Sequence, residues 1–436
     1  MALGGGIFVT QNKKLPGAYI NFVSAARATA TLSDRGVAAL PLSLNWGEVG
    51  KAITVSSEDF LYNSRKLFGY DYSDEALKPI REVFKHATKL ILFRLDTTAT
   101  KATNKFADAK YAGTRGNDLK IVITANTDNP LNFDVKTLLG TTEVDSQVNV
   151  SANTNNLVEN DYVTWKSGVA LELTASTPLS SAQAGTVTAG DWQKAIAALE
   201  SESFNTLGVV STDSEIADLV VAWTKRMRDE VGVKFQTVVY NKAADDKAII
   251  NLVSTIEGQS NDASLIPWVT GAQAGCNVNE SCTNMTYDGE YAVDVNRTQS
   301  QLEECIDKGQ FVLHKVGEDV RVLTDINSKV TVTEDEGDDF KSNQTMRVVD
   351  QIGNDIAVLF NTRYLGKIPN NESGRITLWN DIVKHHQELQ NLGAIEDFAP
   401  ENVVVMKGDT KKSVVVSDAV TPVNAMEQLY MTCVIS

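Results

Sequence analysis

The residue types best suited to catalysis or metal binding are few and scattered in this sequence. The histidines are His86, His314, His385 and His386, and no HExxH zinc-binding motif contains any of them. The cysteines show no CxxC spacing, and no serine stands in a GxSxG nucleophile motif. These residues form no catalytic constellation, and we interpret His86, in a predicted helix, and His314, in a predicted strand, as structural side chains.

His385 and His386 follow Lys384 within a predicted helix. A metal site would need their ring nitrogens to converge on one ion. Adjacent helical side chains instead point about 100° apart, so these two histidines do not readily face one metal. We therefore predict no metal site at this position.

A glycine-rich stretch, AKYAGTRGNDLKIVI (Ala109 to Ile123), has Gly113 and Gly116 on either side of Arg115. A phosphate loop needs such glycines to lead into the N-terminus of a helix, whereas here a strand pattern follows. Neither GxGxxG nor a P-loop motif (GxxxxGKS or GxxxxGKT) occurs in the chain. We therefore expect no nucleotide site and no cofactor.

Acidic side chains are the remaining candidates for metal binding. The run EDEGDD, residues 334–339, lacks the ligand order and the final glutamate of an EF-hand. Asp245, Asp246, Glu257 and Asp262 have no ligand-like spacing. We interpret all of these residues as parts of charged, solvated loops.

The last third of the chain supplies the clearest structural elements. From Gln344 to Phe398, two helical patterns flank a polar turn, and Gly393 stands where a helix C-cap favours glycine. The first apolar stripe comprises Met346, Val349, Ile352, Ile356, Leu359 and Phe360. The second comprises Ile376, Leu378, Trp379, Ile382, Val383, Leu389 and Leu392. These stripes predict a helical hairpin packed into a core.

Two earlier blocks alternate apolar strand patterns with amphipathic helices. In the first block, GVAALPLSL and KLILFRL are predicted strands, and Ser57 and Asp74 are predicted helix caps between them. In the second, helices at 192–201 and 214–231 alternate with the strands TLGVVS, VKFQTVVYN and AIINLVS. A helix at 264–275 and a hairpin, FVLHKV and VRVLTDI, follow. The fold class is therefore α/β (α+β) multidomain, with a layered sheet covered by helices.

A segment with a different sequence pattern, of short strand-like runs and turns, separates these two blocks. The short runs LKIVIT, FDVKTLL, VDSQVNV, YVTWK and VALELTA alternate with turn-forming residues. That spacing predicts a small all-β module of sandwich or barrel type. Because it interrupts an α/β pattern, we interpret it as an insertion at a surface loop.

Length and composition limit the classes of protein to which this chain can belong. The chain has 436 residues, 42% of them hydrophobic, which fits two to four globular domains. Its net charge of −16 argues against general nucleic-acid binding. No apolar run approaches the roughly 18–20 residues of a membrane helix, and the N-terminus lacks a secretory signal pattern. We expect free thiols rather than a disulfide framework.

The N-terminal residues GAYINFV (Gly17 to Val23) alternate like a strand that has no neighbouring strand in the sequence. One interpretation is a frayed terminus. The alternative is a strand that pairs with the sheet edge of another subunit, because unpaired backbone groups favour such a partner.

Taken in order, these segments resemble the contractile tail sheath proteins of myophages, phage-tail-like bacteriocins and defective prophages. The resemblance covers nearly the whole chain and rests on four stretches: PGAYINF, AKYAGTRGNDLKI, the block IDKGQFVLHK to VRVLTDIN, and MRVVDQIGNDI with the YLGK turn, the second helix and GAIEDF. The third block departs mildly from the family pattern at Asp325 to Ser328. The chain resembles the compact sheaths that carry one inserted domain.

The resemblance implies a structural subunit and no enzymatic activity. Sheath subunits stack as hexameric rings around a tail tube, and terminal arms add strands to neighbouring sheets. The C-terminal runs SVVVSDAV and QLYMTCVIS also have strand patterns, with no partner strand nearby in the sequence. The arm residues are Gly17, Ala18, Tyr19, Ile20, Asn21, Phe22, Val414, Val415, Val416, Leu429, Met431 and Val434. The candidate tube-facing residues are Arg375, Lys384, His385 and His386.

The implied partners are other copies of the chain, a tail tube protein, and baseplate and tail terminator proteins, with no direct nucleic-acid contact and no membrane insertion. Synthesis in a bacterial cytoplasm and release within a phage tail or tailocin particle are expected. The expected segments are an N-terminal arm (1–25), a first α/β part (26–103), an inserted β domain (104–188), a second α/β part (189–330), a helical domain (331–412) and a C-terminal arm (413–436).

Two other classes stay open at the level of sequence. A capsid or surface-layer subunit would also lack catalytic motifs and could exchange arms. A nucleotide- or sugar-binding α/β enzyme would need a ligand site that the motifs do not supply.

Overall fold

The computed structural model describes residues 32–435. The described chain divides into two compact units. The large unit contains residues 33–354, 389–398 and 420–435, and the C-terminal unit contains residues 355–388 and 399–419. The predicted arm residues Gly17, Ala18, Tyr19, Ile20, Asn21 and Phe22 lie outside the described residues.

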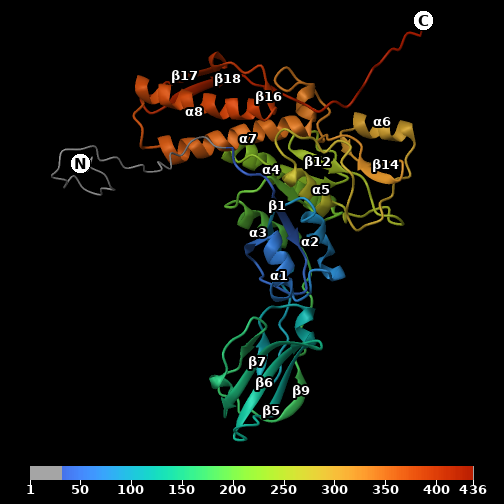
Figure 1. Ribbon diagram of the computed structural model, residues 1–436, viewed down its shortest axis with the longest axis vertical. Helices are drawn as coiled ribbons and strands as arrows, with labels where there is room; N and C mark the ends of the chain where they lie inside the picture. The colour runs from blue at the N-terminus through green and yellow to red at the C-terminus, as the bar shows by residue number, and fades with distance from the viewer. Residues whose placement is uncertain (1–31, 436) are drawn as a thin grey trace, which may run out of the picture. The chain divides into compact units, whose positions relative to one another are not determined.

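A seven-stranded sheet forms the core of the large unit (Figure 1). Its order is β13-β12-β11-β10-β1-β3-β2, and every neighbouring pair is parallel except β2 with β3. The strands are β1 (Val37–Leu42), β2 (Ala52–Ser56), β3 (Lys89–Arg94), β10 (Thr206–Gly208), β11 (Gln236–Tyr240), β12 (Ile249–Leu252) and β13 (Gln310–Phe311). The predicted strand runs of both α/β blocks are confirmed, whereas β2 was not predicted.

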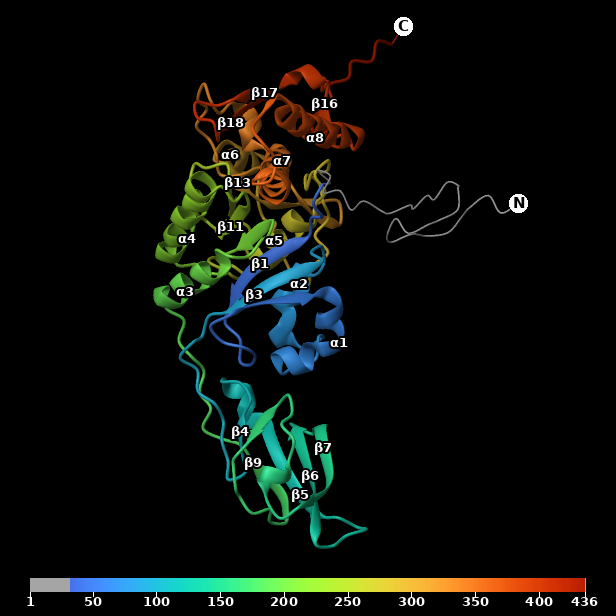
Figure 2. The same ribbon diagram turned by 90° about the vertical axis from the view of Figure 1, so that its left-hand side faces the viewer.

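Helices cover both faces of this sheet (Figure 2). The helices on one face are α3 (Ala189–Leu199) and α4 (Ser214–Arg226); those on the other are α1 (Ser57–Phe68), α2 (Lys78–Val83) and α5 (Ile266–Gly275). Successive strand side chains point to opposite faces, so Ala39 packs in the core with α3 while Ala38 and Leu40 pack in the core with α2. The predicted layered α/β arrangement is confirmed.

Helix caps agree with the sequence to within one residue. The α1 helix begins after Ser56, whose hydroxyl accepts from the Asp59 amide at 3.0 Å, so the predicted cap at Ser57 is displaced by one position. The helix ends at Gly69, whose φ of 78° suits glycine. Asp74 accepts from the Ala76 amide at 2.9 Å and begins the short turn before α2.

The inserted module is an all-β domain, as predicted (Figure 1). Its four-stranded sheet has the order β7-β6-β5-β9, and β4 pairs with β8. The strands are β4 (Ala107–Ala109), β5 (Leu119–Ala125), β6 (Asn132–Leu139), β7 (Thr142–Ser151), β8 (Val163–Trp165) and β9 (Thr174–Pro178). The last strand forms later than the predicted run VALELTA, because Leu171 turns into the core and the pairing with β5 starts at Thr174.

The glycine-rich stretch AKYAGTRG serves packing at the junction between this domain and the sheet. Gly113 has a φ of 119°, and a Cβ at this position would lie 2.3 Å from the Asn45 carbonyl oxygen. The buried Arg94 side chain donates to Asp96 at 2.6 Å and to the Ala112 carbonyl at 2.7 Å. The close backbone approach explains the glycine without a phosphate ligand.

Besides short 3-10 and π-helical turns, the remaining elements among residues 32–435 are short strands and three α-helices. They are α6 (Gln299–Asp307), β14 (Leu313–Val316), β15 (Asp319–Val322), α7 (Asn343–Leu359), α8 (Glu372–Asn391), β16 (Ile395–Glu396), β17 (Val403–Lys407), β18 (Val414–Asp418) and β19 (Thr421–Pro422). The helical hairpin pattern and the Gly393 C-cap are confirmed, with a φ of 75° at Gly393. Ile376 and Leu392 are exposed, so their assignment to the buried stripe of α8 was wrong.

Candidate assembly interface

The C-terminal unit contains an antiparallel strand pair, β17 and β18. Val414, Val415 and Val416 on β18 lie opposite Lys407, Met406 and Val405 on β17. The prediction that these three valines lack a strand partner within the chain was therefore wrong. The partner is the apolar run that precedes the turn at Gly408, whose amide donates to the Ser413 carbonyl at 2.9 Å.

This strand pair is poorly covered within its own unit. Val404 is 44% exposed, Met406 50% and Val415 48%. Within the described chain, β17 and β18 form a sheet of two strands only, so each has an outer edge without a strand neighbour. An isolated two-stranded ribbon is marginally stable in water, and open edges are where further strands add.

The C-terminal tail belongs to the large unit and leaves its surface after Glu427. The Glu427 carboxylate accepts from the hydroxyls of Thr283 at 2.6 Å and Thr324 at 2.9 Å. Beyond this anchor, Leu429 is 87% exposed, Met431 74% and Val434 90%. These predicted arm residues lie in a segment without strand pairing among the described residues. A run of exposed apolar side chains marks an interaction segment.

Of the candidate tube-facing residues, Lys384 alone is exposed. Its side chain is 51% exposed and lies 3.9 Å from Glu388. Arg375 is partly buried and donates to the Asn370 side chain at 3.1 Å. His385 and His386 are wholly buried, so they are not surface residues and we withdraw them as tube-facing candidates.

The two histidines instead connect three elements of the C-terminal unit. His385 Nε2 lies 2.9 Å from Asp355 Oδ2 on α7, and His386 Nε2 lies 2.7 Å from Asp418 Oδ2 at the end of β18. Between them, the two Nδ1 atoms are 3.1 Å apart. The rings meet edge to face, with centroids 5.4 Å apart. Side-chain length thus brings together two rings whose Cα–Cβ directions diverge.

A second link in the C-terminal unit joins the end of α7 to α8. Arg363 and Tyr364, which follow α7, both donate to Asp381 on α8. Burial and the hydrogen bond to this carboxylate raise the pKa of Tyr364. Trp379 on the same helix donates to the Val403 carbonyl at 2.9 Å and so supports β17.

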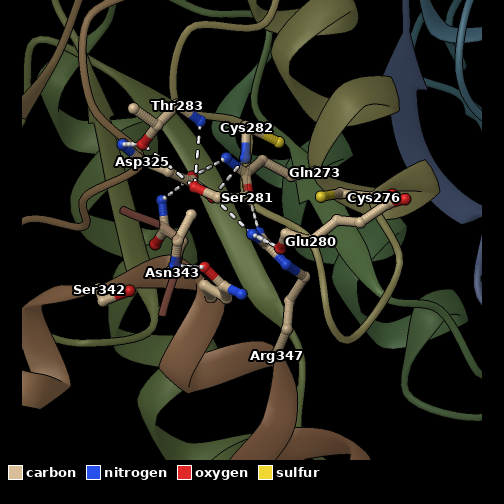
Figure 3. A network of polar contacts seen from close by, with 12 residues as sticks. Gln273, Cys276, Glu280, Ser281, Cys282, Thr283, Asp325, Ser342, Asn343 and Arg347 are labelled. Atoms are coloured by element: carbon tan, nitrogen blue, oxygen red, sulfur yellow. Dashed lines mark hydrogen bonds and ion pairs between the residues drawn. The ribbon is translucent and has the colours of Figure 1, made fainter. Parts of the chain in front are cut away.

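In the large unit, a buried polar cluster surrounds the start of α7 (Figure 3). Arg347 donates to Asp325 at 2.5 Å, to Gln273 at 2.7 Å and to the Glu280 carbonyl at 2.9 Å. Asp325 also accepts from the Asn343 side chain at 2.9 Å. The burial of this polar face of α7 was not predicted from the sequence, because arginine, asparagine and glutamine side chains are usually exposed to solvent. The signal available was the dense polar run NQT that starts the helix.

A second buried ion pair fixes the same helix. Arg228, which follows α4, donates to both carboxylate oxygens of Asp350, at 2.6 and 2.7 Å, and to the Phe235 carbonyl at 2.6 Å. Both side chains are less than 10% exposed. Such bidentate pairs fix geometry as well as charge.

The other candidates for chemistry have structural partners. Over residues 32–435, no group of three or more His, Cys, Asp or Glu side chains is placed to hold a metal ion. In the EDEGDD loop, Glu336 pairs with Lys247 at 2.5 Å and Lys329 at 2.6 Å. All four cysteines are free thiols, as expected, and Cys433 alone is exposed. In the same range, no helix has the length and apolar character needed to cross a bilayer.

The fold and these surfaces define the class of protein. It is a multidomain α/β structural protein with an inserted β-sandwich domain and a helical C-terminal region. Family models match consecutive parts of the chain. They describe the tail sheath protein Gp18 domain III N-terminal region (residues 35–95), the phage tail sheath β-sandwich domain (96–190), the central domain (185–328) and the C-terminal domain (335–436). The chain belongs to the phage tail sheath protein family.

Relatives of full length support this assignment. The phage-like element PBSX protein XkdK of Bacillus subtilis is 31% identical over 98% of this chain and 99% of its own. The crystal structure of the sheath tail protein from Desulfitobacterium hafniense superposes with a TM-score of 0.82 and 33% identity, covering 95% of this chain and 99% of the other. The protein is thus a subunit of a contractile tail sheath, part of a phage tail or a tailocin-like particle.

A more distant structure shares the fold. The helical sheath of the anti-feeding prophage, solved in its contracted state, has a TM-score of 0.57 and 14% identity over 97% of this chain and 99% of its own. The architecture is therefore retained at low sequence identity.

Proposed function

We propose that this sheath subunit polymerises as stacked hexameric rings around a tail tube by exchanging terminal strands with its neighbours. The observation that carries the proposal is the β17–β18 pair, whose exposed valines and outer strand edges suit strand addition. Each added main-chain hydrogen bond contributes about 0.5–1.5 kcal/mol. Repeated over many subunits, these bonds hold a continuous mesh.

The donated strands are the two terminal arms. The C-terminal tail supplies Leu429, Met431 and Val434, which are exposed in the isolated chain. The N-terminal arm, Gly17 to Phe22, has the alternating pattern of a strand. Val414, Val415 and Val416 then belong to the accepting sheet of the neighbouring subunit rather than to a donated arm.

Contraction in this proposal needs no nucleotide hydrolysis. The extended lattice is metastable, and the arms keep subunits connected while their folded bodies rotate into a wider, better-packed lattice. The free energy stored during assembly drives the tube through a target cell envelope. The exposed side chain of Lys384 on α8 is the proposed contact with the tube protein. Arg375, which lies on the opposite side of the same helix, stays a separate candidate.

The finer assignments belong to the same proposal. The partners are the tail tube protein and the baseplate and tail terminator proteins, and the particle is assembled in a bacterial cytoplasm before release. The six-segment division, with arms at 1–25 and 413–436, also stands as a proposal, and within the second arm only the part that follows β18 is donated.

Deletion of Ala2 to Val23 tests the arm exchange directly. We expect a folded monomer by circular dichroism that forms no tubes in negative-stain microscopy, whereas the full chain forms hollow striated cylinders. Tubes like those of the full chain from this deletion would refute arm exchange. Shells or flat lattices from the full chain would point instead to a capsid or surface-layer protein.

A second variant tests the other arm without shortening the chain. Replacing Leu429, Met431 and Val434 by serine removes the apolar side chains that the arm would bury. We expect loss of polymerisation with unchanged monomer stability. In the matched control, serine replaces Leu131 and Leu173, which are also exposed but lie in the β domain. This control variant should polymerise normally.

A further inference from the structure

A small polar pocket lies in the large unit, at the amino ends of three adjacent parallel strands, β1, β10 and β11. Arg35 lines it from the segment before β1, Asn205 from the residue before β10, Lys234 from the segment before β11, and Arg347 from α7. The volume of the pocket is about 20 Å³. A single water molecule needs about 10–15 Å³ by the same measure, so the pocket has room for one occupant of about that size.

Four cationic side chains surround this pocket, and two of them have carboxylate partners. Arg347 pairs with Asp325, and Arg228 pairs with Asp350, which itself lines the pocket. Each pair is neutral and buried, so neither carboxylate is left over to balance another cation.

The other two cations, Arg35 and Lys234, have no counter-charge of this kind. Arg35 donates to two backbone carbonyl oxygens, at 2.8 and 3.0 Å, and Lys234 Nζ donates to the carbonyl of Arg228. Within residues 32–435 neither side chain forms an ion pair with a carboxylate, and Asp229 nearby is exposed. Residues 1–31 contain no aspartate or glutamate that could supply one.

The pKa values of both side chains reflect this excess of positive charge. Burial, followed by the charge of Arg347, lowers the pKa of Arg35 to about 10. Burial and the charge of Arg228 lower the pKa of Lys234. The Asp350 carboxylate offsets only part of these effects in each case. An anion in the pocket would stabilise both charged forms.

The lining of the pocket also includes hydrogen-bond donors that the chain leaves unused. Both terminal nitrogens of the Arg347 guanidinium group donate to the residues around it (Figure 3), but its buried Nε has no hydrogen-bond partner among residues 32–435. The Asn205 side-chain oxygen accepts from the amides of Gly36 and Val37, at 3.1 and 3.0 Å, so its NH₂ group points away from them. A buried donor without an acceptor is unfavourable, so these groups favour an acceptor in the pocket.

We propose that this pocket binds one halide ion, chloride under ordinary conditions, held by Arg35, Lys234 and Arg347. A halide accepts hydrogen bonds and donates none, and its negative charge offsets the two cations that lack a carboxylate. A water molecule would accept from the same donors but would leave the charge uncompensated. The volume favours a monatomic ion over phosphate or sulfate.

The bound ion joins the amino ends of three strands to α7, so it stabilises the large unit independently of any assembly. This effect differs from general screening by salt, which weakens ion pairs and does not depend on the identity of the anion. Binding at one site instead gives a stabilisation that follows the concentration of the specific ion.

Urea denaturation of the full-length protein in chloride, with gluconate added to hold the ionic strength constant, tests the site. If the folded subunit binds one chloride and the unfolded chain none, the unfolding constant falls about tenfold per tenfold rise in chloride above the dissociation constant. The variant Lys234→Met removes one cation and keeps a side chain of similar length. We expect its fall to begin at a chloride concentration at least about tenfold higher, or to be lost.

The matched control is Lys242→Met. Lys242 is also partly buried in the large unit, but it pairs with Asp218 and does not line the pocket. It should keep the chloride dependence of the parent protein. A parent protein without chloride dependence, or a Lys234→Met variant with the same dependence as the parent, would overturn the proposal.

Bromide gives an independent readout on the parent protein, should Lys234→Met fail to fold. In crystals of the full-length protein grown in sodium bromide, we expect an anomalous scattering peak beside Arg347 Nε and Lys234 Nζ. Density at this position without an anomalous signal would identify a water molecule and refute the halide site.

Discussion

Arg347 donates a 2.5 Å hydrogen bond to Asp325, and each side chain of this ion pair is only 1% exposed. Burial alone would raise the pKa of Asp325, but the Arg347 charge and the hydrogen bond from Gln273 hold it below the usual aspartate value. The pair joins the start of α7 to the loop that follows β15, so it fixes the helix at the end of the large unit. Its energetic role follows from desolvation: each charge is tolerated only beside the other.

The variant Arg347→Met should destabilise the large unit by about 3–5 kcal/mol, because it leaves the Asp325 carboxylate buried without its counter-charge. Urea denaturation measures the loss. Adding Asp325→Asn should restore part of it, since a neutral amide needs no counter-charge. The control Lys308→Met removes a solvent-exposed pair with Glu304 and should leave stability nearly unchanged. Equal effects of the two single variants would contradict this account.

The Asp245 carboxylate should hold two loops of the large unit together in a pH-dependent way. Its carboxylate accepts from the Val330 amide at 2.7 Å and from the amide and hydroxyl of Thr331 at 2.9 and 2.5 Å. The Thr331 hydroxyl, followed by the two amides, lowers the pKa of Asp245 to about 2.

Because the pKa of Asp245 is lowered, its ionised carboxylate stabilises the folded protein fully above the ordinary aspartate pKa of about 3.9. This stabilisation is lost as the pH falls through about 2. Exchange at the Val330 and Thr331 amides, taken relative to the intrinsic rate at each pH, should accelerate as the pH falls over that range. In Asp245→Asn the same amides should exchange without this pH dependence. A parent protein that shows no acceleration would count against this role of Asp245.

Gly271 on α5 should not tolerate a side chain. A Cβ there would lie 2.3 Å from the Val83 carbonyl oxygen at the end of α2. Gly271→Ala must therefore push the two helices apart, with an expected loss of about 1–3 kcal/mol. At Gly353 in α7 the nearest atom to such a Cβ is 3.5 Å away, so Gly353→Ala should gain about 0.5–1 kcal/mol of helix stability. Thermal unfolding of the two variants should show opposite signs.

Lys384→Glu tests the proposed contact with the tail tube. The side chain is exposed and its pair with Glu388 is weak, so folding should change by less than about 0.5 kcal/mol. Attachment of sheath to purified tubes should weaken in co-sedimentation, and more so at low salt, where charge interactions are less screened. Lys308→Glu, at an exposed position in α6, serves as the control. If Lys384→Glu co-sediments with tubes as well as the parent protein does, α8 does not contact the tube through this side chain.

Short-range periodicity explains why much of the fold was predictable. Apolar runs such as KLILFRL gave β3, and the i, i+3, i+4 stripes gave α7 and α8, because each element must bury one face. The strand β2 was missed because it is short and half exposed at the sheet edge, with one fully buried residue, Val55. Ile376, near the start of α8, and Leu392, just after its end, fit the stripe but are exposed.

The sequence by itself determined the elements, the inserted β domain and the resemblance to tail sheaths, since these depend on local pattern and on order along the chain. Only the tertiary structure decided which polar side chains are buried and which strand pairs with which. Arg347 and Asp325 are 22 residues apart, and His386 and Asp418 are 32 apart, so no local pattern relates them. Val414, Val415 and Val416 pair with β17 because a turn at Gly408 brings the runs together. Burial and pairing over such separations are set by packing of the whole chain, which one-dimensional periodicity does not contain.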